Sequence, residues 1–303
     1  MPGARVWLLS RLFVGIMILN MLRERLLLQS RRVVVIKNVL SIAGSDPSGG
    51  AGIQADLKSF AANGAYGMAV ITALTAQNTT GVAGVEFVHP SFVHDQIKAV
   101  FSDVRVDAVK IGMVGTADIA TAVADALSMY QSIPIVLDPV MMAKGGAPLM
   151  TDDAMEAVCK RLVPLATIVT PNLPEAAKLI AGEEAQTRDD MIAQAKAITA
   201  LGPRAALVKG GHLDEEQSPD VLFADGEINW FDGPRTVTKN THGTGCTLSS
   251  ALAAQLAKGL SLPLSAKRAK DYVAGAIASA DELCVGSGHG PINHFNQLWD
   301  DKS

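Results

Sequence analysis

The fold is indicated first by residues 39–55, which read VLSIAGSDPSGGAGIQA. The first five of these residues form an apolar run of the kind found in strands that are buried on both faces. The glycine-rich run at residues 45–52 then predicts a turn, and a helical pattern follows it. A strand, a turn and a helix in this order predict a βαβ unit, from which parallel sheets are built.

The same alternation continues along the chain. Short apolar runs predict strands at residues 39–43, 68–73, 108–111, 134–137, 167–170 and 205–208. Alanine-rich segments of helical period lie between them. The helix after Thr187 begins with a Thr-x-x-Asp cap, and the residues on its core face are Met191, Ala195, Ile198 and Leu201. We therefore expect an α/β fold with a mostly parallel central sheet.

A small antiparallel edge is expected late in the chain. Residues 221–224 and 227–231 flank Asp225 and Gly226, and an Asp-Gly pair between two apolar runs is a hairpin signal. Two alanine-rich helices are predicted after this hairpin, at residues 244–258 and 265–283. Because no internal repeat or low-complexity linker divides residues 38–303, we expect a single domain there.

The composition excludes several classes of protein. The chain has 303 residues, of which 49% are hydrophobic and 18% charged, so it is neither disordered nor collagen-like. Beyond residue 37 there are 19 basic and 29 acidic residues, and this formal charge of −10 repels nucleic acid. Three cysteines without a C-x-x-C pair, and six histidines without H-E-x-x-H, give no support to structural zinc or disulfides. We therefore expect a cytoplasmic protein.

Residues 1–37 form a basic, apolar leader with seven basic residues and one acid. The longest uncharged run in it has 11 residues, whereas a membrane-spanning helix needs about 20. The sequence after this run, RERLLL, lacks the small-x-small cleavage site of a signal peptide. A poorly ordered extension is therefore predicted, in preference to a helix lying on a membrane surface.

Polar residues and glycines follow the predicted strands, at the points where open α/β sheets bind their ligands. These residues are Gly44, Gln77, Gly112, Asp138, Asn172 with Glu175, and Lys209. Any one of them is ordinary turn chemistry, but six such strand exits in register predict a site at this edge of the sheet.

Two other nucleotide-binding motifs find little support. Residues 50–55 match the G-x-G-x-x-A of dinucleotide-binding folds, but those folds need an acid near the end of the second strand. Residues 66–84 contain no Asp or Glu. A Walker A motif, G-x-x-x-x-G-K-[ST], is absent from the sequence. Hydride transfer and P-loop chemistry are therefore disfavoured.

The strongest signal lies at residues 240–246, NTHGTGC, directly before an alanine-rich helix. Small residues with free N–H groups at a helix start bind anions, and this predicts a phosphate site. The residues concerned are Thr241, Gly243, Thr244 and Gly245. Cys246 lies in the first helical turn, where the pKa of a thiol can fall, which makes it a candidate base. His242 is expected to face solvent or to neighbour the phosphate, with a minor role.

Two carboxylates near the phosphate site predict a metal. Asp138 follows a buried strand, and Glu175 lies one helical turn beyond Asn172. Because bare acids repel phosphate, we expect Asp138 and Glu175 to hold Mg²⁺, with helix capping as the alternative role of Glu175. Lys209, at a strand end before two glycines, is expected to add positive charge, although a surface lysine is the common alternative.

Several of these segments resemble the ribokinase-like kinases, and within them the hydroxymethylpyrimidine and phosphomethylpyrimidine kinases of thiamine biosynthesis. The resemblance runs through VLSIAGSDPSGGAG at residues 39–52, TAQNT at 75–79, KIGM at 110–113, TPNLPEA at 170–176, KGGH at 209–212 and KNTHGTGC at 239–246. It extends nearly to Phe295 and leaves out only the leader and the tail.

The resemblance implies a ribokinase-like three-layer α/β/α sandwich and a kinase that depends on ATP and Mg²⁺. Such an enzyme phosphorylates the pyrimidine alcohol and then phosphorylates the monophosphate to the diphosphate. A homodimer is also implied, although no residue in the sequence indicates its interface.

The resemblance also implies roles for single residues. Gln77 and Asp56 resemble ligands of the pyrimidine ring, and Gly44 and Met113 resemble residues that line it. ATP and Mg²⁺ are then expected on Asn172, Glu175, Lys209, Thr241, Thr244 and the loop from Gly243 to Gly245. Cys246 stands where most relatives carry the aspartate that activates the substrate hydroxyl. The amide of Gln77 suits an aminopyrimidine, because it can donate to a ring nitrogen and accept from an exocyclic amine.

Two alternatives share these loops. A pyridoxal kinase of the same superfamily has the same nucleotide apparatus and binds a different small ring, so relative turnover on the two alcohols separates the two enzymes. A non-catalytic pyrimidine or nucleotide sensor would bind its ligand without forming ADP. The presence of Cys246, Asp138 and Glu175 argues against a sensor.

We predict that the leader is dispensable, because none of the motifs lies within it. Removing residues 1–37 should leave kinase turnover and the thermal unfolding midpoint unchanged when purified truncated and full-length chains are compared. A truncated chain that folds but loses its activity would contradict this expectation.

Overall fold

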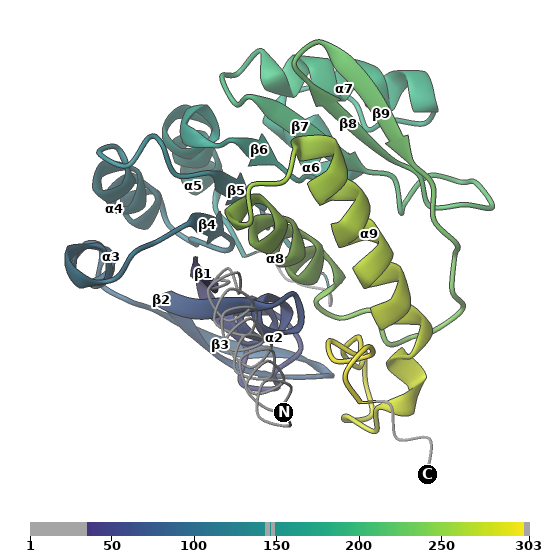
Figure 1. Ribbon diagram of the computed structural model, residues 1–303, viewed down its shortest axis with the longest axis horizontal. Helices are drawn as coiled ribbons and strands as arrows, with labels where there is room; N and C mark the ends of the chain where they lie inside the picture. Colours follow the sequence, from purple (N-terminus) through teal and green to yellow (C-terminus); the bar gives the residue numbers. More distant parts are fainter. Residues whose placement is uncertain (1–34, 143–145, 147–148, 300–303) are drawn as a thin grey trace, which may run out of the picture. The chain divides into compact units, whose positions relative to one another are not determined.

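The structure is a computed structural model that describes residues 35–142, 146 and 149–299 (Figure 1). The predicted disorder of the leader concerns residues that lie almost wholly outside this range, so it stays a prediction. Its predicted end at residue 37 is wrong by one residue, because Lys37 is the first residue of a strand. From Lys37 onward the chain forms one compact unit. No helix within the described ranges is long and apolar enough to cross a membrane.

A nine-stranded sheet, counted over the described residues, runs through this unit in the order β3-β2-β1-β4-β5-β6-β7-β8-β9 (Figure 1). Its strands are β1 Lys37–Ser45, β2 Ala65–Asn78, β3 Gly81–Phe87, β4 Ala108–Ile111, β5 Ile135–Leu137, β6 Ile168–Val169, β7 Ala205–Lys209, β8 Asp220–Ala224 and β9 Glu227–Phe231. Strands β1, β2 and β4 to β7 are parallel to one another, whereas β3, β8 and β9 are antiparallel to their neighbours. The mostly parallel sheet and the antiparallel edge at β8 and β9 are therefore confirmed.

A second antiparallel edge, formed by β2 and β3, goes beyond the predicted set of strands. β2 extends past the predicted residues 68–73 as far as Asn78 and turns back through Thr79 and Thr80. The Asn78 side chain accepts hydrogen bonds from the N–H and hydroxyl groups of Thr80 at 2.9 and 2.6 Å, which closes the turn. Most side chains of this ribbon are exposed or half-buried, so no continuous apolar run marks it in the sequence.

The helices follow the predicted pattern with shifted ends. They are α2 Gly52–Ala62, α3 Pro90–Asp103, α4 Ala117–Leu127, α5 Asp152–Ala157, α6 Leu173–Leu179, α7 Arg188–Thr199, α8 Thr244–Ala257 and α9 Leu262–Ala278. The predicted cap of α7 is confirmed, since Thr187 and Asp190 bond reciprocally. Leu201 lies beyond the end of α7 and is 37% exposed, so its expected place in the core is wrong. α9 begins earlier than predicted because Pro263 fits the first turn of a helix.

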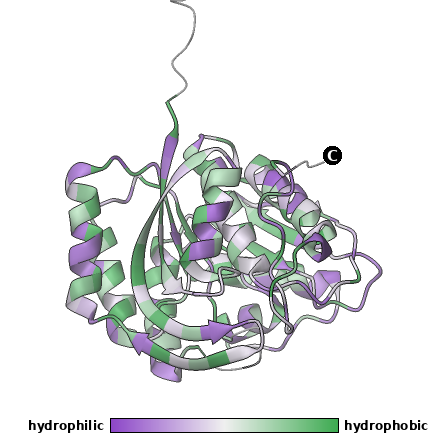
Figure 2. Ribbon diagram, turned by 90° about the horizontal axis from the view of Figure 1, so that it is seen from below, coloured by the Kyte–Doolittle hydropathy of each residue, from purple (hydrophilic) through white to green (hydrophobic). Residues whose placement is uncertain are grey.

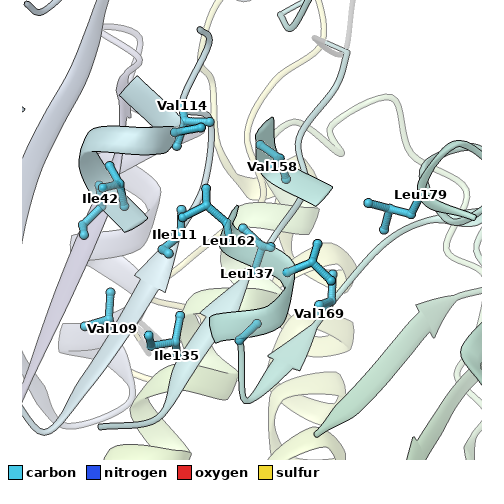
Figure 3. Close-up of a cluster of buried hydrophobic side chains, with 14 of the residues drawn as sticks. Ile42, Val109, Ile111, Val114, Ile135, Leu137, Val158, Leu162, Val169 and Leu179 are labelled. Atoms are coloured by element: carbon cyan, nitrogen blue, oxygen red, sulfur yellow. The ribbon is translucent and has the colours of Figure 1, made fainter. Parts of the chain in front are cut away.

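Successive strand residues point to opposite faces of the sheet, and helices cover both faces. On one face strand residues pack with α3 to α7; Figure 3 shows this cluster, with Ile111 and Leu137 beside Leu162. On the other face Val39 and Ala108 pack with α2, α8 and α9. Figure 2 shows hydrophilic and hydrophobic residues alternating along the outer helices, as expected when only one side of a helix meets the core. The predicted three-layer α/β/α sandwich is therefore confirmed.

Lys110, on β4, has no exposure to solvent although it is charged. Its ammonium donates to both carboxylate oxygens of Asp56 on α2, each at 2.9 Å. The hydroxyls of Ser41 on β1 and Ser250 on α8 donate to the same carboxylate at 2.6 and 2.7 Å. Buried charges are tolerated only when they are paired and hydrogen-bonded, and this cluster meets that condition. It also fixes α2 and α8 against β1 and β4.

Replacing Asp56 by asparagine should lower the free energy of unfolding by about 3–5 kcal/mol, because the ammonium of Lys110 would stay buried without its counter-charge. Urea unfolding followed by circular dichroism measures the change. The matched control is Asp271→Asn, which removes the exposed partner of Lys267 and should cost less than about 1 kcal/mol. Similar losses in the two variants would show that the buried pair contributes no more than a surface ion pair.

Candidate active site

The C-terminal ends of the parallel strands meet the N-terminus of α8 at one edge of the sheet. Asp138 directly follows β5, and Lys209 is the last residue of β7. Gly245, in the first turn of α8, lies against both of them, since a Cβ atom added to it would be 3.3 Å from Lys209 Nζ and 3.5 Å from Asp138 Oδ2. The structure therefore brings together the helix start, the carboxylate and the lysine that the sequence predicts to share a site.

The loop before α8 is shaped by close contact between two glycine-rich segments. Gly243 has a φ of +81°, and a Cβ atom on it would lie 1.8 Å from the carbonyl oxygen of Gly50, so only glycine fits. The hydroxyl of Thr244 donates to the carbonyl of Thr241 at 2.8 Å, which closes the turn. The N–H groups of the two residues after Thr244 have no acceptor within the helix and lie at the positive end of its dipole. This arrangement favours an anion.

Asp138 and Lys209 form a buried ion pair, with 3.0 Å between Asp138 Oδ1 and Lys209 Nζ. The hydroxyl of Thr170 donates to the same oxygen at 3.1 Å. Burial opposes ionisation of Asp138, but the ammonium groups of Lys209 and Lys110 hold its pKa below the usual range. Burial lowers the pKa of Lys209, but the negative charges of Asp138 and Glu175 raise it by more than burial lowers it. The pKa of Lys209 is therefore above its usual value. Both members of the pair are therefore charged at neutral pH.

Glu175 has the capping role that the sequence gives as its alternative. It forms a capping box at the start of α6, where its carboxylate accepts from Asn172 N–H and its own N–H donates to the Asn172 side chain, both at 2.8 Å. The carboxylate also lies 3.9 Å from Lys209 Nζ. Burial raises the pKa of Glu175, Lys209 lowers it and Asp138 raises it again, to about 7. Glu175 is thus both a helix cap and a carboxyl that exchanges its proton near neutral pH.

The surroundings of Cys246 contradict the predicted fall in its pKa. Burial has the largest effect and raises the pKa, and the carboxylates of Asp56 and Asp138 raise it further. The ammonium of Lys110 and the N–H group of Gly52 lower the pKa, but by less than burial and the two carboxylates raise it. The pKa of Cys246 is therefore about 11. The helix start is therefore outweighed by burial and by two acids that lie far away in the sequence. The residue is a protonated thiol at neutral pH.

The residues expected around the pyrimidine ring lie in three different surroundings. Gly44 and Met113 are in contact, since a Cβ atom on Gly44 would be 2.5 Å from Met113 Cε. Gln77 lines an open cavity of about 560 Å³, together with Pro47 and residues of the β2–β3 turn. Asp56 has no exposure to solvent, and its carboxylate is taken up by the buried cluster around Lys110. Of the four residues, only Gln77 lines this cavity.

Asp46 and His242 form a buried pair that the sequence analysis does not predict. His242 Nε2 lies 2.8 Å from Asp46 Oδ2, and the two residues are 8% and 2% exposed. The carboxylate of Asp46 also accepts from the N–H groups of Ser48, Gly50 and Ala51, so the glycine-rich segment is a fixed turn. Exposure of His242 to solvent, one of its two expected positions, is therefore wrong. In the sequence, the aspartate at the start of the glycine-rich turn is the feature that points to this pair.

The importance of Lys110 is likewise not apparent from the sequence. It lies in the apolar run of β4, where a lysine has to be buried and therefore needs a partner. Its ammonium acts on the pKa values of both Cys246 and Asp138. The partner, Asp56, lies 54 residues earlier in the chain, so sequence spacing does not reveal the pair.

The predicted metal ligands meet at the ammonium of Lys209. Within residues 35–142, 146 and 149–299 no three His, Cys, Asp or Glu side chains are grouped as metal ligands. Asp138 and Glu175 lie 3.0 and 3.9 Å from Lys209 Nζ. Mg²⁺ is commonly held by one or two carboxylates together with phosphate oxygens and water, so these two residues fit a metal that is shared with a phosphate.

Known proteins resemble the chain over most of its length. Residues 46–293 match the family model described as phosphomethylpyrimidine kinase. The chain is 52% identical over 262 residues to the hydroxymethylpyrimidine/phosphomethylpyrimidine kinase of Escherichia coli (strain K12), which covers 86% of this chain and 98% of that protein. It is 50% identical over 258 residues to a bifunctional thiamine biosynthesis protein of Geobacter sulfurreducens, over 85% of this chain and 52% of that protein.

A solved structure supports the fold. The crystal structure of a Bacillus subtilis pyridoxal kinase in complex with ADP has a TM-score of 0.79 and 35% identity to this chain, and covers 87% of this chain and 99% of its own. The expected ribokinase-like fold is thereby confirmed. In sequence, the chain is more similar to the pyrimidine kinase of Escherichia coli than to this pyridoxal kinase.

In the ligand-free protein, alkylation of Cys246 by iodoacetamide should be slow at pH 7 and should rise about tenfold per pH unit. The reason is that only the thiolate reacts, while burial raises the pKa of this thiol to about 11. Peptide mass spectrometry gives the rate at each pH, and the exposed Cys284 is the internal control. A rate for Cys246 that levels off below pH 8 would indicate a lowered pKa.

Proposed function

Because the chain belongs to the phosphomethylpyrimidine kinase family, we propose how its site performs the reactions of that family. The protein is a hydroxymethylpyrimidine and phosphomethylpyrimidine kinase of thiamine biosynthesis, which uses ATP to phosphorylate the alcohol and then the monophosphate. The observation that best supports phosphoryl transfer at the start of α8 is the contact of Gly245 with the ion pair of Lys209 and Asp138. It puts an anion-binding helix start beside a cation and a carboxylate.

The phosphates of ATP lie at the start of α8 in this proposal. The N–H groups of the loop around Gly243 and Gly245 bind their oxygens, and the charged ammonium of Lys209 neutralises part of their charge. The remaining residues assigned to the nucleotide are Asn172, Thr241 and Thr244. Pre-placed donors of this kind stabilise charge on the transferring group without having to reorganise during the reaction.

Asp138 and Glu175 would hold Mg²⁺ together with the phosphate oxygens. When bound, the ion supplies charge neutralisation on the phosphates. Asp138 is ionised in advance, because Lys209 keeps its pKa low despite burial. Glu175 has a pKa of about 7, raised by burial, and would release its proton when the cation arrives.

We propose that Cys246 is the base that accepts the proton of the substrate alcohol. In the first transfer the alcohol oxygen attacks the γ-phosphorus, the bond from that phosphorus to ADP breaks, and the alcohol proton passes to the Cys246 sulfur. The sulfur has to give up its own proton to solvent beforehand, because burial raises its pKa to about 11. The rate of the first transfer should therefore increase with pH.

The second transfer needs less help from a base. A phosphate monoester has a second pKa near about 6, so at neutral pH it is mostly a dianion that can attack without losing a proton. Two anionic phosphates must then be held close together, which makes the ammonium of Lys209 and the metal more important. The same site thus serves two acceptors with different requirements.

Pyridoxal kinase activity is the alternative, since the similar Bacillus subtilis structure is a pyridoxal kinase. The pyrimidine assignment is supported by the higher identity to the Escherichia coli enzyme and by the amide of Gln77, which suits an aminopyrimidine. A sensor without catalysis is disfavoured because Lys209, Asp138 and the start of α8 lie together. The homodimer and the cytoplasmic location stay predictions.

Replacing Cys246 by alanine should slow phosphorylation of the alcohol by about 10² or more, the usual contribution of a general base, and should slow the second phosphorylation much less. Both rates are measured on one folded preparation at the same pH with saturating Mg²⁺ and ATP. Equal losses in the two steps would mean that Cys246 shapes the anion site and takes no proton.

Cys246→Asp is the matched variant. A carboxylate ionises at a lower pH than a thiol, so this variant should keep base catalysis and flatten the rise of the first rate between pH 7 and 9. The pH profile of the second transfer should be similar in both proteins. A first-transfer profile that Cys246→Asp leaves unchanged would assign the pH dependence to another group.

A further inference from the structure

The side-chain amide of Gln77 lies between two polar neighbours that come from different parts of the chain. Its nitrogen is placed 3.4 Å from His242 Nε2, and its oxygen is placed 3.2 Å from the hydroxyl oxygen of Thr75. The two ends of a side-chain amide have nearly the same shape and opposite hydrogen-bonding character. The neighbours therefore decide which end faces which way.

His242 Nε2 carries a hydrogen atom. Asp46 Oδ2 lies 2.8 Å from it and also accepts the N–H groups of Gly50 and Ala51. Hydrogen bonds from His242 and Ser48, acting against burial, hold the pKa of Asp46 at about 2. Because a carboxylate cannot donate, the hydrogen between it and His242 belongs to Nε2, which therefore has no lone pair to accept a hydrogen bond from the Gln77 amide.

The hydroxyl of Thr75 is an acceptor toward Gln77. It donates its one hydrogen to the carbonyl oxygen of Ser45 at 2.8 Å, so no hydrogen is left for a second bond. An amide nitrogen facing His242 would therefore set a donor against a donor, and an amide oxygen facing Thr75 would set an acceptor against an acceptor. A half-turn of the amide about its last bond removes both conflicts.

We propose that Asp46, His242 and Thr75 hold the Gln77 amide in this turned orientation, with Oε1 toward His242 and Nε2 toward Thr75, and thereby set the ring specificity of the enzyme. The proposal rests on the role of Gln77 at the ring under the proposed function. In it, the three residues are positioning residues that act through Gln77.

The turned orientation leaves one lone pair on Oε1 and one hydrogen on Nε2 for the ligand. An aminopyrimidine offers a ring nitrogen as acceptor beside an exocyclic amine as donor, and both match. A pyridoxal ring offers a phenolic oxygen beside an aldehyde, so the aldehyde oxygen would face the amide oxygen. A fixed amide therefore favours the pyrimidine, whereas an amide that is free to turn discriminates less.

The positioning residues are themselves held by the main chain. His242 N–H donates to Gly290 O at 3.0 Å, and the N–H group of Ile292 donates to His242 O at 3.4 Å. The same C-terminal segment reaches the β2–β3 turn, where His289 N–H donates to Thr79 O at 2.9 Å. These bonds fix the main chain of His242, and the hydrogen bond to Asp46 fixes its ring.

The test compares Thr75→Val, Gln77→Leu and the double variant Gln77→Leu/Thr75→Val. Affinity for hydroxymethylpyrimidine is measured by calorimetric titration, and turnover is measured with hydroxymethylpyrimidine and with pyridoxal. Thr75→Val should weaken pyrimidine binding about tenfold, the effect of losing one hydrogen bond, and lower the preference for pyrimidine over pyridoxal by a similar factor. The KM for ATP should not change. In the double variant, Thr75→Val should add no loss to that of Gln77→Leu, because it acts through the amide.

Ser48→Ala is the control, since it takes a hydroxyl from Asp46 Oδ1 and leaves Oδ2 on His242. It should keep the wild-type preference between the two rings. If Gln77→Leu weakens pyrimidine binding but Thr75→Val alters neither affinity nor preference, the proposal is overturned and the role of Gln77 stands. Additive losses in the double variant would also overturn it. If Gln77→Leu itself leaves the affinity unchanged, the ring assignment fails as well.

Discussion

The rest of this structure depends on the burial of one charged side chain, Lys110, which water cannot reach. The charge of Lys110 has to be neutralised inside the protein, and Asp56 does so with the help of two serine hydroxyls. Because these groups come from β1, α2, β4 and α8, one cluster holds all four elements in register. The first turn of α8, with Gly245 and Cys246, is therefore placed by a buried polar cluster as well as by apolar packing.

The arrangement of the sheet follows from the sequence wherever strands are buried on both faces. Apolar runs such as those of β1, β4 and β7 stand out against alanine-rich helices, and the Asp225-Gly226 pair marks the hairpin. The β2–β3 ribbon does not stand out, because its side chains are mostly open to solvent and no core selects an apolar pattern there. The observed ends of some helices differ from the predicted ones because a local signal decides where the helix begins. In α9 this signal is Pro263, which lies before the residue where the periodic pattern suggests a start.

The place of the site could also be predicted, because parallel strands deliver their C-terminal residues to one edge, and Asp138 and Lys209 do meet there. The protonation state of Cys246 could not be predicted from the sequence, because it depends on burial and on carboxylates that other elements supply. The pairing of His242 with Asp46, across 196 residues, likewise exists only once the chain has folded.

The C-terminal segment that bonds to both Thr79 and His242 has a consequence for the newborn chain. Translation delivers the sheet and most of the helices long before residues 289–292 leave the ribosome. Until then neither the turn beside the cavity that Gln77 lines nor the loop before α8 has its last main-chain partners. A chain that lacks residues 289–292 would therefore present these two segments without their last main-chain partners.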